Sequence, residues 1–162
     1  MLLAFGGIGL MRFGTRRSVA FLPWVESVIP GLIPSDELRP NLTSHDNDLK
    51  CETLGILTDR EDPCALDLAI PLLENGDDYV WLNAAHYVGS CGRIEAVPYL
   101  IKALRHSAWR GDADVVGYLR SITGKDFGTD FNRWHEWWIS EHPDFQFDWE
   151  SKLGPIPRLP LN

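Results

Sequence analysis

Apolar residues recur in the middle of the chain at the spacing of an α-helix. Residues 66–73 and 97–104 each carry apolar side chains at i, i+3, i+4 and i+7, which form one face of a helix. These positions are Leu66, Ala69, Ile70 and Leu73 in the first segment, and Val97, Leu100, Ile101 and Leu104 in the second. The pattern therefore predicts two amphipathic helices that are related by an offset of 31 residues.

A second set of apolar positions, ahead of these segments, repeats at the same offset. Its members are Leu54, Ile56 and Leu57, then Ala85, Tyr87 and Val88, then Val116, Tyr118 and Leu119. A helix pair of about 31 residues cannot bury its apolar stripe alone, so successive pairs are expected to stack. The periodicity predicts an all-α fold, a short α-solenoid of antiparallel helix pairs.

Residues that start and stop helices stand between these segments. Asp62 and Pro63 suit an N-cap and a first helical position, where the missing N–H of proline costs nothing. Pro71 falls inside the helix expected over 63–75, and it should remove a hydrogen bond and bend the axis. Further N-caps are expected at Asp78 and Asp112, and further helix ends at Gly76, Gly89, Gly92 and Gly124.

Three stretches of the sequence resemble HEAT-like repeats, especially the short bacterial repeats of the phycobilisome-lyase type. They are residues 84–89 (AAHYVG), 95–100 (EAVPYL) and 119–128 (LRSITGKDFG), the last followed by Trp134 and Trp138. The resemblance covers roughly residues 46–140, and it implies a right-handed α-solenoid that serves mainly as a binding scaffold. The chain departs from that pattern at Asn83, where a basic residue is common, and its third copy lacks a matching second helix.

Residues 1–44 are expected to form an N-terminal extension ahead of the repeat domain, residues 45–142. Apolar residues at helical spacing predict a capping helix at 17–29. Prolines at positions 30, 34 and 40 predict a linking loop over 30–44. At the far end, residues 143–162 predict an irregular, proline-rich tail that is either draped on the domain or free.

A tryptophan-rich helix is expected to cap the C-terminal end of the repeats. Thr129 or Asp130 can supply its N-cap. Its apolar side, at i, i+3 and i+7, consists of Phe131, Trp134 and Trp138. This side is predicted to seal the solenoid by burying aromatic area. Trp137 points elsewhere and is a candidate for an exposed partner-binding anchor.

The chain is acidic, and its charge is uneven. It holds 15 Lys and Arg residues against 23 Asp and Glu residues, a formal net charge of −8. Residues 41–80 alone hold ten acidic residues against two basic ones, so the acidity lies in the stretch 46–78. Nucleic acid is not the expected partner, because phosphate binding relies on Lys and Arg.

The cysteines and the apolar start of the chain bear on its location. Three cysteines without a CxxC spacing fit a reducing compartment, so we expect a cytoplasmic protein in which Cys51, Cys64 and Cys91 are small buried side chains. The apolar run at 1–11 is shorter than the roughly 20 residues of a membrane-spanning helix. Arginines follow this run, which is the reverse of a secretory signal. No membrane partner is therefore expected.

The sequence shows no pattern that meets the needs of a catalytic or metal site. A nucleophile with its base, a phosphate cradle and a spaced set of metal ligands are each missing. His135 and Glu136 form a single His-Glu pair, whereas HEAT-like di-iron hydroxylases use several, and His86 suits a surface or packing position. We expect no catalysis, no cofactor and no metal. A HEAT-like enzyme, bilin lyase-like or DNA-modifying, is the last alternative.

The expected partner is another protein, bound by the second helices of the pairs, which line the concave face of HEAT-like repeats. The candidate binding residues are Asp67, Glu74, Tyr99, Lys102, Arg105, Trp109 and Trp137. Ion pairs between repeats, worth roughly 0–1 kcal/mol each, are the alternative role of the charged ones. The leading function is a non-catalytic protein–protein interaction module. The runner-up is an acidic immunity or antitoxin protein that neutralises a basic toxin, because charge complementarity speeds encounter.

Overall fold

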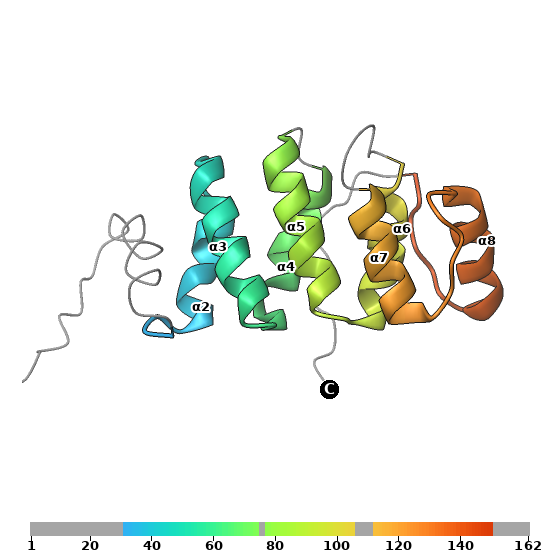
Figure 1. Cartoon of the computed structure of the whole chain (residues 1–162), viewed down its shortest axis with the longest axis horizontal. Helices are drawn as coiled ribbons and strands as arrows, with labels where there is room; N and C mark the ends of the chain where they lie inside the picture. The colour runs from blue at the N-terminus through green and yellow to red at the C-terminus, as the bar shows by residue number, and fades with distance from the viewer. Residues whose placement is uncertain (1–30, 75–76, 106–111, 151–162) are drawn as a thin grey trace, which may run out of the picture.

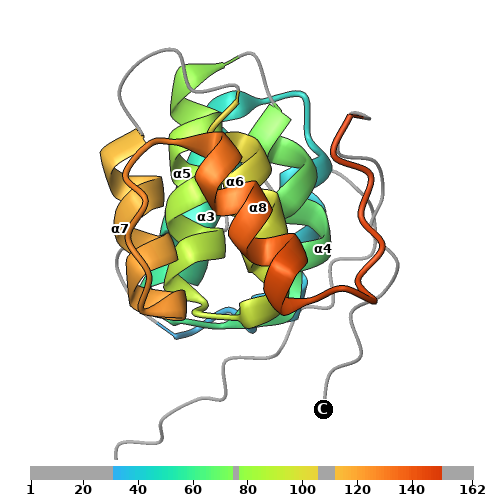
Figure 2. The same cartoon turned by 90° about the vertical axis from the view of Figure 1, so that its right-hand side faces the viewer.

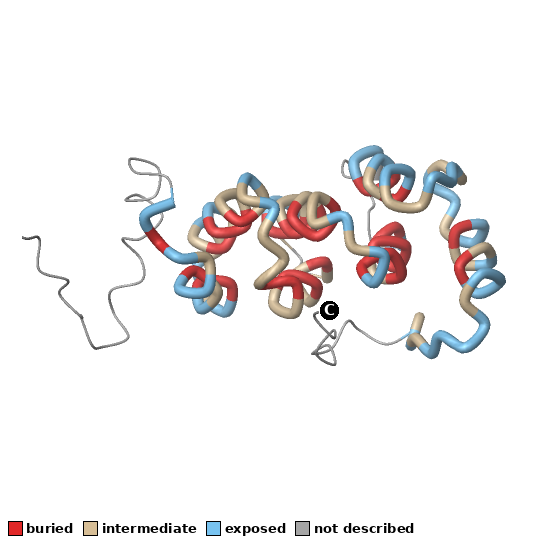
Figure 3. The backbone as a smooth tube through the Cα atoms, turned by 90° about the horizontal axis from the view of Figure 1, so that it is seen from below, coloured by how far each residue is buried: buried red, intermediate tan, exposed pale blue. Residues whose placement is uncertain are grey.

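The computed structural model describes residues 31–74, 77–105 and 112–150, and these form α- and 3₁₀-helices with no strand. Long helices stand side by side in a front row, with shorter helices in a back row behind them (Figure 1; Figure 3). The front row is α3 (Asn47–Asp59), α5 (Asp78–Ser90) and α7 (Asp112–Thr123), and the back row is α2 (Ser35–Leu38), α4 (Leu66–Ala69) and α6 (Val97–Ala103). Helix α8 (Phe131–Glu141) closes one end (Figure 2). The predicted all-α class is confirmed for the described residues.

Short 3₁₀-helices extend the back row. They are η2 (Arg39–Thr43), η3 (Pro63–Ala65), η4 (Ile70–Glu74) and η5 (Ile94–Ala96). The helix expected over 63–75 is therefore divided, because α4 ends at Ala69 and η4 begins at Ile70. Pro71 has no N–H to donate to the preceding turn, so the α-helical hydrogen bonds cannot continue through it. The predicted disruption at Pro71 is confirmed.

The core lies between the two rows (Figure 3), and the repeated apolar positions form much of it. Six front-row positions are at most 3% exposed: Leu54, Leu57, Ala85, Val88, Val116 and Leu119. Eight back-row positions are at most 9% exposed: Leu66, Ala69, Ile70, Leu73, Val97, Leu100, Ile101 and Leu104. The helical spacing of apolar residues thus identifies the faces that pack inward.

Aspartates cap the helices near the points where the sequence predicts them. Asp62 and Asp130 each accept a hydrogen bond from a backbone N–H of the first helical turn, at 3.0 and 3.1 Å. Helix α5 is capped by Asp77, whose carboxylate accepts from two backbone N–H groups at 3.0 and 3.1 Å. The predicted cap at Asp78 is wrong by one residue, because Asp77 has the extended backbone of an N-cap and Asp78 is already helical.

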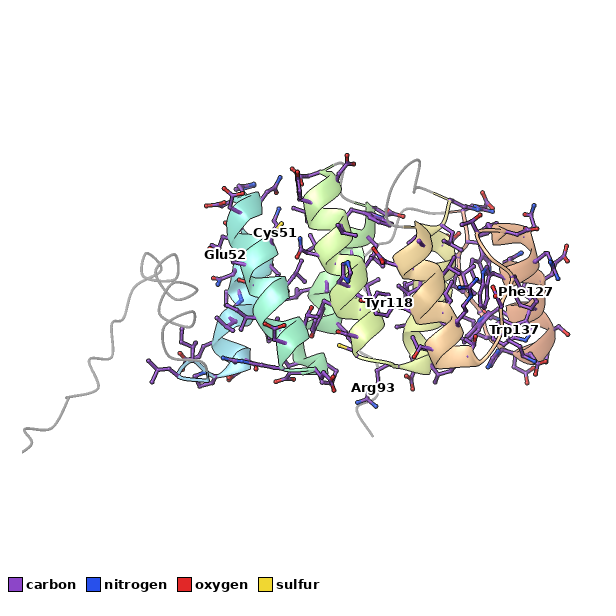
Figure 4. The ribbon with its side chains drawn as sticks, in the orientation of Figure 1. Cys51, Glu52, Arg93, Tyr118, Phe127 and Trp137 are labelled. Atoms are coloured by element: carbon purple, nitrogen blue, oxygen red, sulfur yellow. The ribbon has the colours of Figure 1, made fainter. Side chains whose placement is uncertain are left out.

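Glycines end two helices as predicted, but Gly89 has a different role. Gly92 and Gly124 take positive φ angles of 62° and 70° just after α5 and α7, a conformation that favours glycine. Gly89 lies inside α5, and the ring of Tyr118, placed between α5 and α7, packs over it (Figure 4). Its prediction as a helix end is wrong, since the missing side chain admits that ring. Gly76 lies outside the described residues. The cap predicted at Asp112 is wrong, because α7 already begins at that residue.

Residues 31–44 are largely helical and packed, so the linking loop predicted there is wrong. Helices α2 and η2 occupy most of the segment, and Leu38 and Leu42 are 0% and 2% exposed. Pro34 stands at the N-cap of α2 and Pro40 in the first turn of η2. At those positions the missing N–H breaks no hydrogen bond, so proline is compatible with both helices.

Helix α8 buries the aromatic side that its spacing predicts. Trp134 is 0% and Trp138 3% exposed, while Phe131 is half-buried against the core. The Trp134 Nε1–H donates to the carbonyl oxygen of Gly128 at 2.8 Å, which fixes the ring against the turn that precedes the helix.

Some predictions concern parts of the chain outside the described ranges. They are the extension up to residue 30, with its capping helix at 17–29, and the end of the tail, residues 151–162. Within the described ranges, no helix has both the length and the hydropathy of a membrane span.

Candidate binding surface on helix α6

One side of α6 presents three of the candidate binding residues. Tyr99, Lys102 and Arg105 follow one another at intervals of three residues, which brings their side chains close together on a helix. Pro98 stands in the first turn of α6, where proline is tolerated. Arg105 follows the helix end, and its N–H donates to the carbonyl of Lys102 at 3.1 Å, so the last turn keeps its helical course.

A returning segment of the chain lies against this side of α6. After α8 the chain turns back, and residues 143–150 run toward α6 without forming a helix (Figure 2; Figure 3). The Lys102 Nζ donates to the main-chain carbonyl of Asp148 at 3.1 Å, and the Arg105 Nη1 donates to that of Trp149 at 3.0 Å. Of the two arrangements expected for the tail, its described part takes the draped one.

Arg105 is the polar centre of this contact. Its Nη1 and Nη2 each donate to the Glu150 Oε1 at 3.0 Å. Its Cζ lies 4.1 Å from the centre of the Phe131 ring, at cation–π distance. One guanidinium thus joins the end of α6 to α8 and to the returning segment, with charge-assisted hydrogen bonds on one side and an aromatic ring on the other.

Aromatic rings fill the space between α6, α8 and the returning segment. Tyr99 and Phe147 meet edge to face with ring centres 4.9 Å apart, and Phe147 meets Trp149 at 4.6 Å. Trp149 also contacts the ring of His135, on α8, at 4.5 Å. Burial raises the pKa of the Tyr99 hydroxyl above its ordinary value. The segment is therefore held by ring packing as well as by hydrogen bonds.

Lys102 carries a charge that is almost completely removed from water. Its side chain is 2% exposed, and the Glu74 Oε1 lies 3.9 Å from its Nζ. The Nζ also lies 5.6 Å from the centre of the Phe147 ring. Burying an ammonium group is costly unless polar or π-electron groups face it. The carboxylate, the ring and the Asp148 carbonyl together offset that cost.

Four of the seven candidate residues meet at this surface: Glu74, Tyr99, Lys102 and Arg105. Asp67 forms an ion pair with Arg39 at 2.8 Å, and that hydrogen bond lowers the pKa of the Asp67 carboxyl. Arg105 turns to the returning segment rather than to Glu74, which stands 31 positions earlier in the chain. The charged candidate residues are thus only partly brought together on one surface. Trp109 lies outside the described residues.

Trp137 is not the exposed anchor that its position on the helix suggests. Its ring is half-buried, with its centre 6.1 Å from that of Phe127 and 5.9 Å from that of Trp134 (Figure 4). Phe127 comes from the turn between α7 and α8, and it covers a side of α8 that the helical spacing treats as open. The helical spacing predicts the direction of the Trp137 side chain, but it does not predict that Phe127 packs over that side chain.

The residues of the returning segment were missing from the candidate set. Phe147, Asp148, Trp149 and Glu150 were expected only to be part of an irregular tail. A signal is present in the sequence, because aromatic residues occupy every second position at Phe145, Phe147 and Trp149. Alternate residues of an extended chain point to the same side, so this spacing suits a segment that packs one edge on a surface.

The front row presents a separate acidic surface on α3. Asp48, Glu52 and Asp59 are exposed and stand at i, i+4 and i+11, close to one line along the helix. Figure 4 shows Glu52 on this helix. The three carboxylates belong to the acidic stretch 46–78. This surface differs from the α6 surface in charge and in exposure, because the α6 surface presents Lys102 and Arg105 and is covered by the returning segment.

A polar contact joins α5 to α7 in the front row. The His86 Nδ1 lies 2.7 Å from the Tyr118 hydroxyl oxygen, and the His86 Nε2 lies 3.7 Å from the Asp114 Oδ2. The His86 side chain is 40% exposed. His86 therefore occupies a surface packing position between two helices, as the sequence analysis expects.

Comparisons with protein-family models, curated proteins and solved structures found no match. Among the described residues, no group of three or more His, Cys, Asp or Glu side chains is arranged to hold a metal ion.

Proposed function

We propose that the chain is a HEAT-like, right-handed α-solenoid that acts as a non-catalytic protein-binding module. The two rows of helices support this proposal, as does the burial of most apolar residues that stand 31 positions apart. The chain's resemblance to short bacterial HEAT-like repeats points the same way, because such repeats present helix faces to other proteins.

The observation that carries the proposal is the extended segment held on α6. Lys102 and Arg105 donate to main-chain carbonyls of residues 148 and 149, and rings on α6 and α8 contact its side chains. Main-chain hydrogen bonds combined with places for alternate side chains are a recurring way to bind a peptide. Arginine and aromatic residues are also enriched among the residues that dominate binding energy in interfaces.

The acidic surface on α3 favours a second candidate function, an immunity or antitoxin protein that binds a basic toxin. Asp67 and Glu74 lie opposite basic side chains of the same chain, so the exposed Asp48, Glu52 and Asp59 would attract such a partner. Exposed charges of one sign speed encounter with an oppositely charged protein.

Cross-linking of the purified full chain in a lysate of the source organism, followed by mass spectrometry, tests both candidates. Arg105→Glu alters the α6 surface, and the pair Asp48→Lys and Glu52→Lys alters the α3 surface. The exposed Lys125 and Glu141 provide matched control reversals, Lys125→Glu and Glu141→Lys. Each variant is first shown to be folded by circular dichroism.

The binding-module proposal predicts a protein that cross-links to the wild-type chain and to both controls, and is lost with Arg105→Glu. Loss with the α3 reversals instead, with a basic protein as the partner, favours the immunity candidate. A chain that cross-links to no protein above the level of an unrelated acidic protein contradicts both.

A further inference from the structure

We propose that the α6 surface binds an extended segment of a partner protein that is aromatic and acidic, and that residues 145–150 are its built-in occupant. The partner's segment would displace the chain's own. This inference rests on the proposed function as a protein-binding module, and it names the class of partner.

The polar contacts at the α6 surface are of two kinds, those to the main chain of the bound segment and those to one of its side chains. Two of them reach main-chain carbonyls, those of Asp148 and Trp149, which every peptide offers. The third is different, because both terminal nitrogens of Arg105 donate to the Glu150 carboxylate. An acidic residue at this position of a partner would form the same charge-assisted pair.

Ring contacts indicate that the side chains at positions 147 and 149, ahead of Glu150, also contribute to recognition. Phe147 meets the Tyr99 ring with ring centres 4.9 Å apart, and the Lys102 Nζ lies 5.6 Å from the centre of the Phe147 ring. Trp149 packs on His135. Gln146 is exposed and places little demand on a side chain, whereas the Asp148 Oδ1 accepts from the Glu150 N–H at 3.0 Å, beside the residue that pairs with Arg105. The fitting segment therefore reads aromatic, hydrogen-bond acceptor, aromatic, acidic.

The burial of Lys102 favours replacement of the segment by another peptide over an α6 surface with no peptide bound. The lysine is 2% exposed beneath the segment, and its Nζ is bonded to the Asp148 carbonyl. Removing the segment with no replacement takes the Asp148 carbonyl and the Phe147 ring away from this ammonium group in a partly apolar site, which is unfavourable. A second peptide of the same chemistry restores the acceptor and the ring, so exchange avoids that cost.

The edges of the built-in segment are the parts that a competitor can replace first. The Glu150 side chain is 82% exposed, and Phe145 is 42% exposed. Segments with few buried contacts open locally at a small fraction of the global unfolding free energy. Displacement can thus begin at Glu150 while the two rows of helices stay folded.

Peptide binding to the full chain tests the inference. The probe is a fluorescein-labelled peptide with the sequence of residues 143–150, PDFQFDWE, and binding is followed by fluorescence anisotropy. Phe147→Ala weakens the built-in occupant, so the variant should bind the peptide about tenfold or more tightly than the wild type, since self-occupancy no longer lowers the open fraction. Adding Arg105→Ala to this variant should abolish the gain.

Three controls define the result. Tyr79→Ala removes an aromatic side chain that is 76% exposed on α5, outside both the segment and the α6 surface, and it should leave peptide affinity within about twofold of the wild type. A peptide of the same composition in scrambled order should not bind. Circular dichroism shows whether each variant is folded.

The inference is overturned if folded Phe147→Ala binds the peptide no better than the wild type, or if Arg105→Ala leaves the gain intact. Should Phe147→Ala fail to fold, Glu150→Lys takes its place, because that side chain is exposed and outside the core. It must raise peptide affinity in the same direction, or the segment is a fixed part of the fold. A chain that cross-links to a protein in the lysate yet binds no peptide refutes this inference alone and leaves the binding module standing.

Discussion

At the scale of single residues, Gly89 shows how the absence of a side chain can determine the distance between two helices. A Cβ atom built at this position would overlap the ring of Tyr118, well inside van der Waals contact. The ring belongs to α7, and its hydroxyl is hydrogen-bonded to His86 on α5, so the Tyr118 side chain is held against α5. Glycine is thus required here for close approach, although it is inside a helix, where it is otherwise unfavourable.

We expect Gly89→Ala to destabilise the protein by about 1–3 kcal/mol, because the added methyl group displaces the Tyr118 ring from its place between α5 and α7. Urea unfolding followed by circular dichroism measures the change. Gly117→Ala, also inside a helix but facing open space, is the matched control. It should be neutral or stabilising by up to about 1 kcal/mol. Equal effects of the two substitutions would contradict the role of Gly89.

The thiols of Cys64 and Cys91 are predicted to be poor nucleophiles. Burial raises the pKa of each to about 11, above the ordinary range of a cysteine. A raised thiol pKa keeps the group neutral at physiological pH, so the alkylation rate should rise about tenfold per pH unit up to about 11. Iodoacetamide labelling read by mass spectrometry tests this, with the urea-unfolded chain as control. A plateau near pH 9 in the folded protein would exclude it.

At the scale of elements, the Tyr87 hydroxyl ties α5 to the turn that precedes α4. It donates to the carbonyl of Asp62 at 2.6 Å and accepts from the N–H of Ala65 at 3.0 Å. The ring is fully buried, and this burial raises the pKa of the hydroxyl. One side chain thereby satisfies two backbone groups of a neighbouring helix pair.

Tyr87→Phe should cost about 1–3 kcal/mol of unfolding free energy, since it leaves two buried backbone groups without that partner. Tyr79→Phe is the control, because the Tyr79 side chain is 76% exposed and should be silent. Thermal unfolding of both variants checks the difference. A silent Tyr87→Phe would mean that the hydroxyl adds nothing to the joint between the helix pairs.

Elements that depend on local chemistry were predictable, and those that depend on distant contacts were not. The apolar spacing identified buried positions such as Leu100, and the missing N–H of Pro71 identified the break after α4. The prolines predict a loop where α2 and η2 form, because the local proline signal does not include the burial of Leu38 and Leu42. Local signals carry no information about which other segment provides the cover.

At the scale of the whole molecule, acid should destabilise the fold. The pKa of the Asp67 carboxyl is lowered mainly by the hydrogen bond from Arg39, and that of Asp126 by the one from Arg120. The pKa of the Asp77 carboxyl is lowered by the backbone N–H groups that it caps at the start of α5. A lowered folded-state pKa stabilises the protein above the ordinary carboxyl pKa, and this contribution is lost as the pH falls through the folded value.

Urea unfolding as a function of pH should therefore show stability falling from about pH 5 downward. Asp67→Asn should be less stable than the wild type at neutral pH by on the order of 1 kcal/mol or less, given that the side chain is 43% exposed. The two curves should converge in strong acid, where the wild-type carboxyl is protonated. A difference that stays constant with pH would show that the ion pair with Arg39 does not contribute.

The sequence predicts the residues of α6 that form the candidate site, but it does not predict the segment that covers them. Tyr99, Lys102 and Arg105 were named from their places in the second helix of a pair, and the structure brings them together. The carbonyl groups that bind Arg105 and Lys102 lie 44 and 46 residues further along the chain, after α7 and α8. No local period relates positions so far apart, so the contact could only be seen in three dimensions.

The distance along the chain between α6 and its cover also sets an order of events during synthesis. Lys102 and Asp148 are separated by 46 residues. At about 5–20 residues per second, a ribosome needs roughly 2 to 9 seconds to add them. Throughout that interval the side of α6 with Tyr99 and Lys102 has no internal occupant. A partner encountered by the nascent chain would meet this surface without a competitor, so assembly during translation would be faster than assembly with the finished protein.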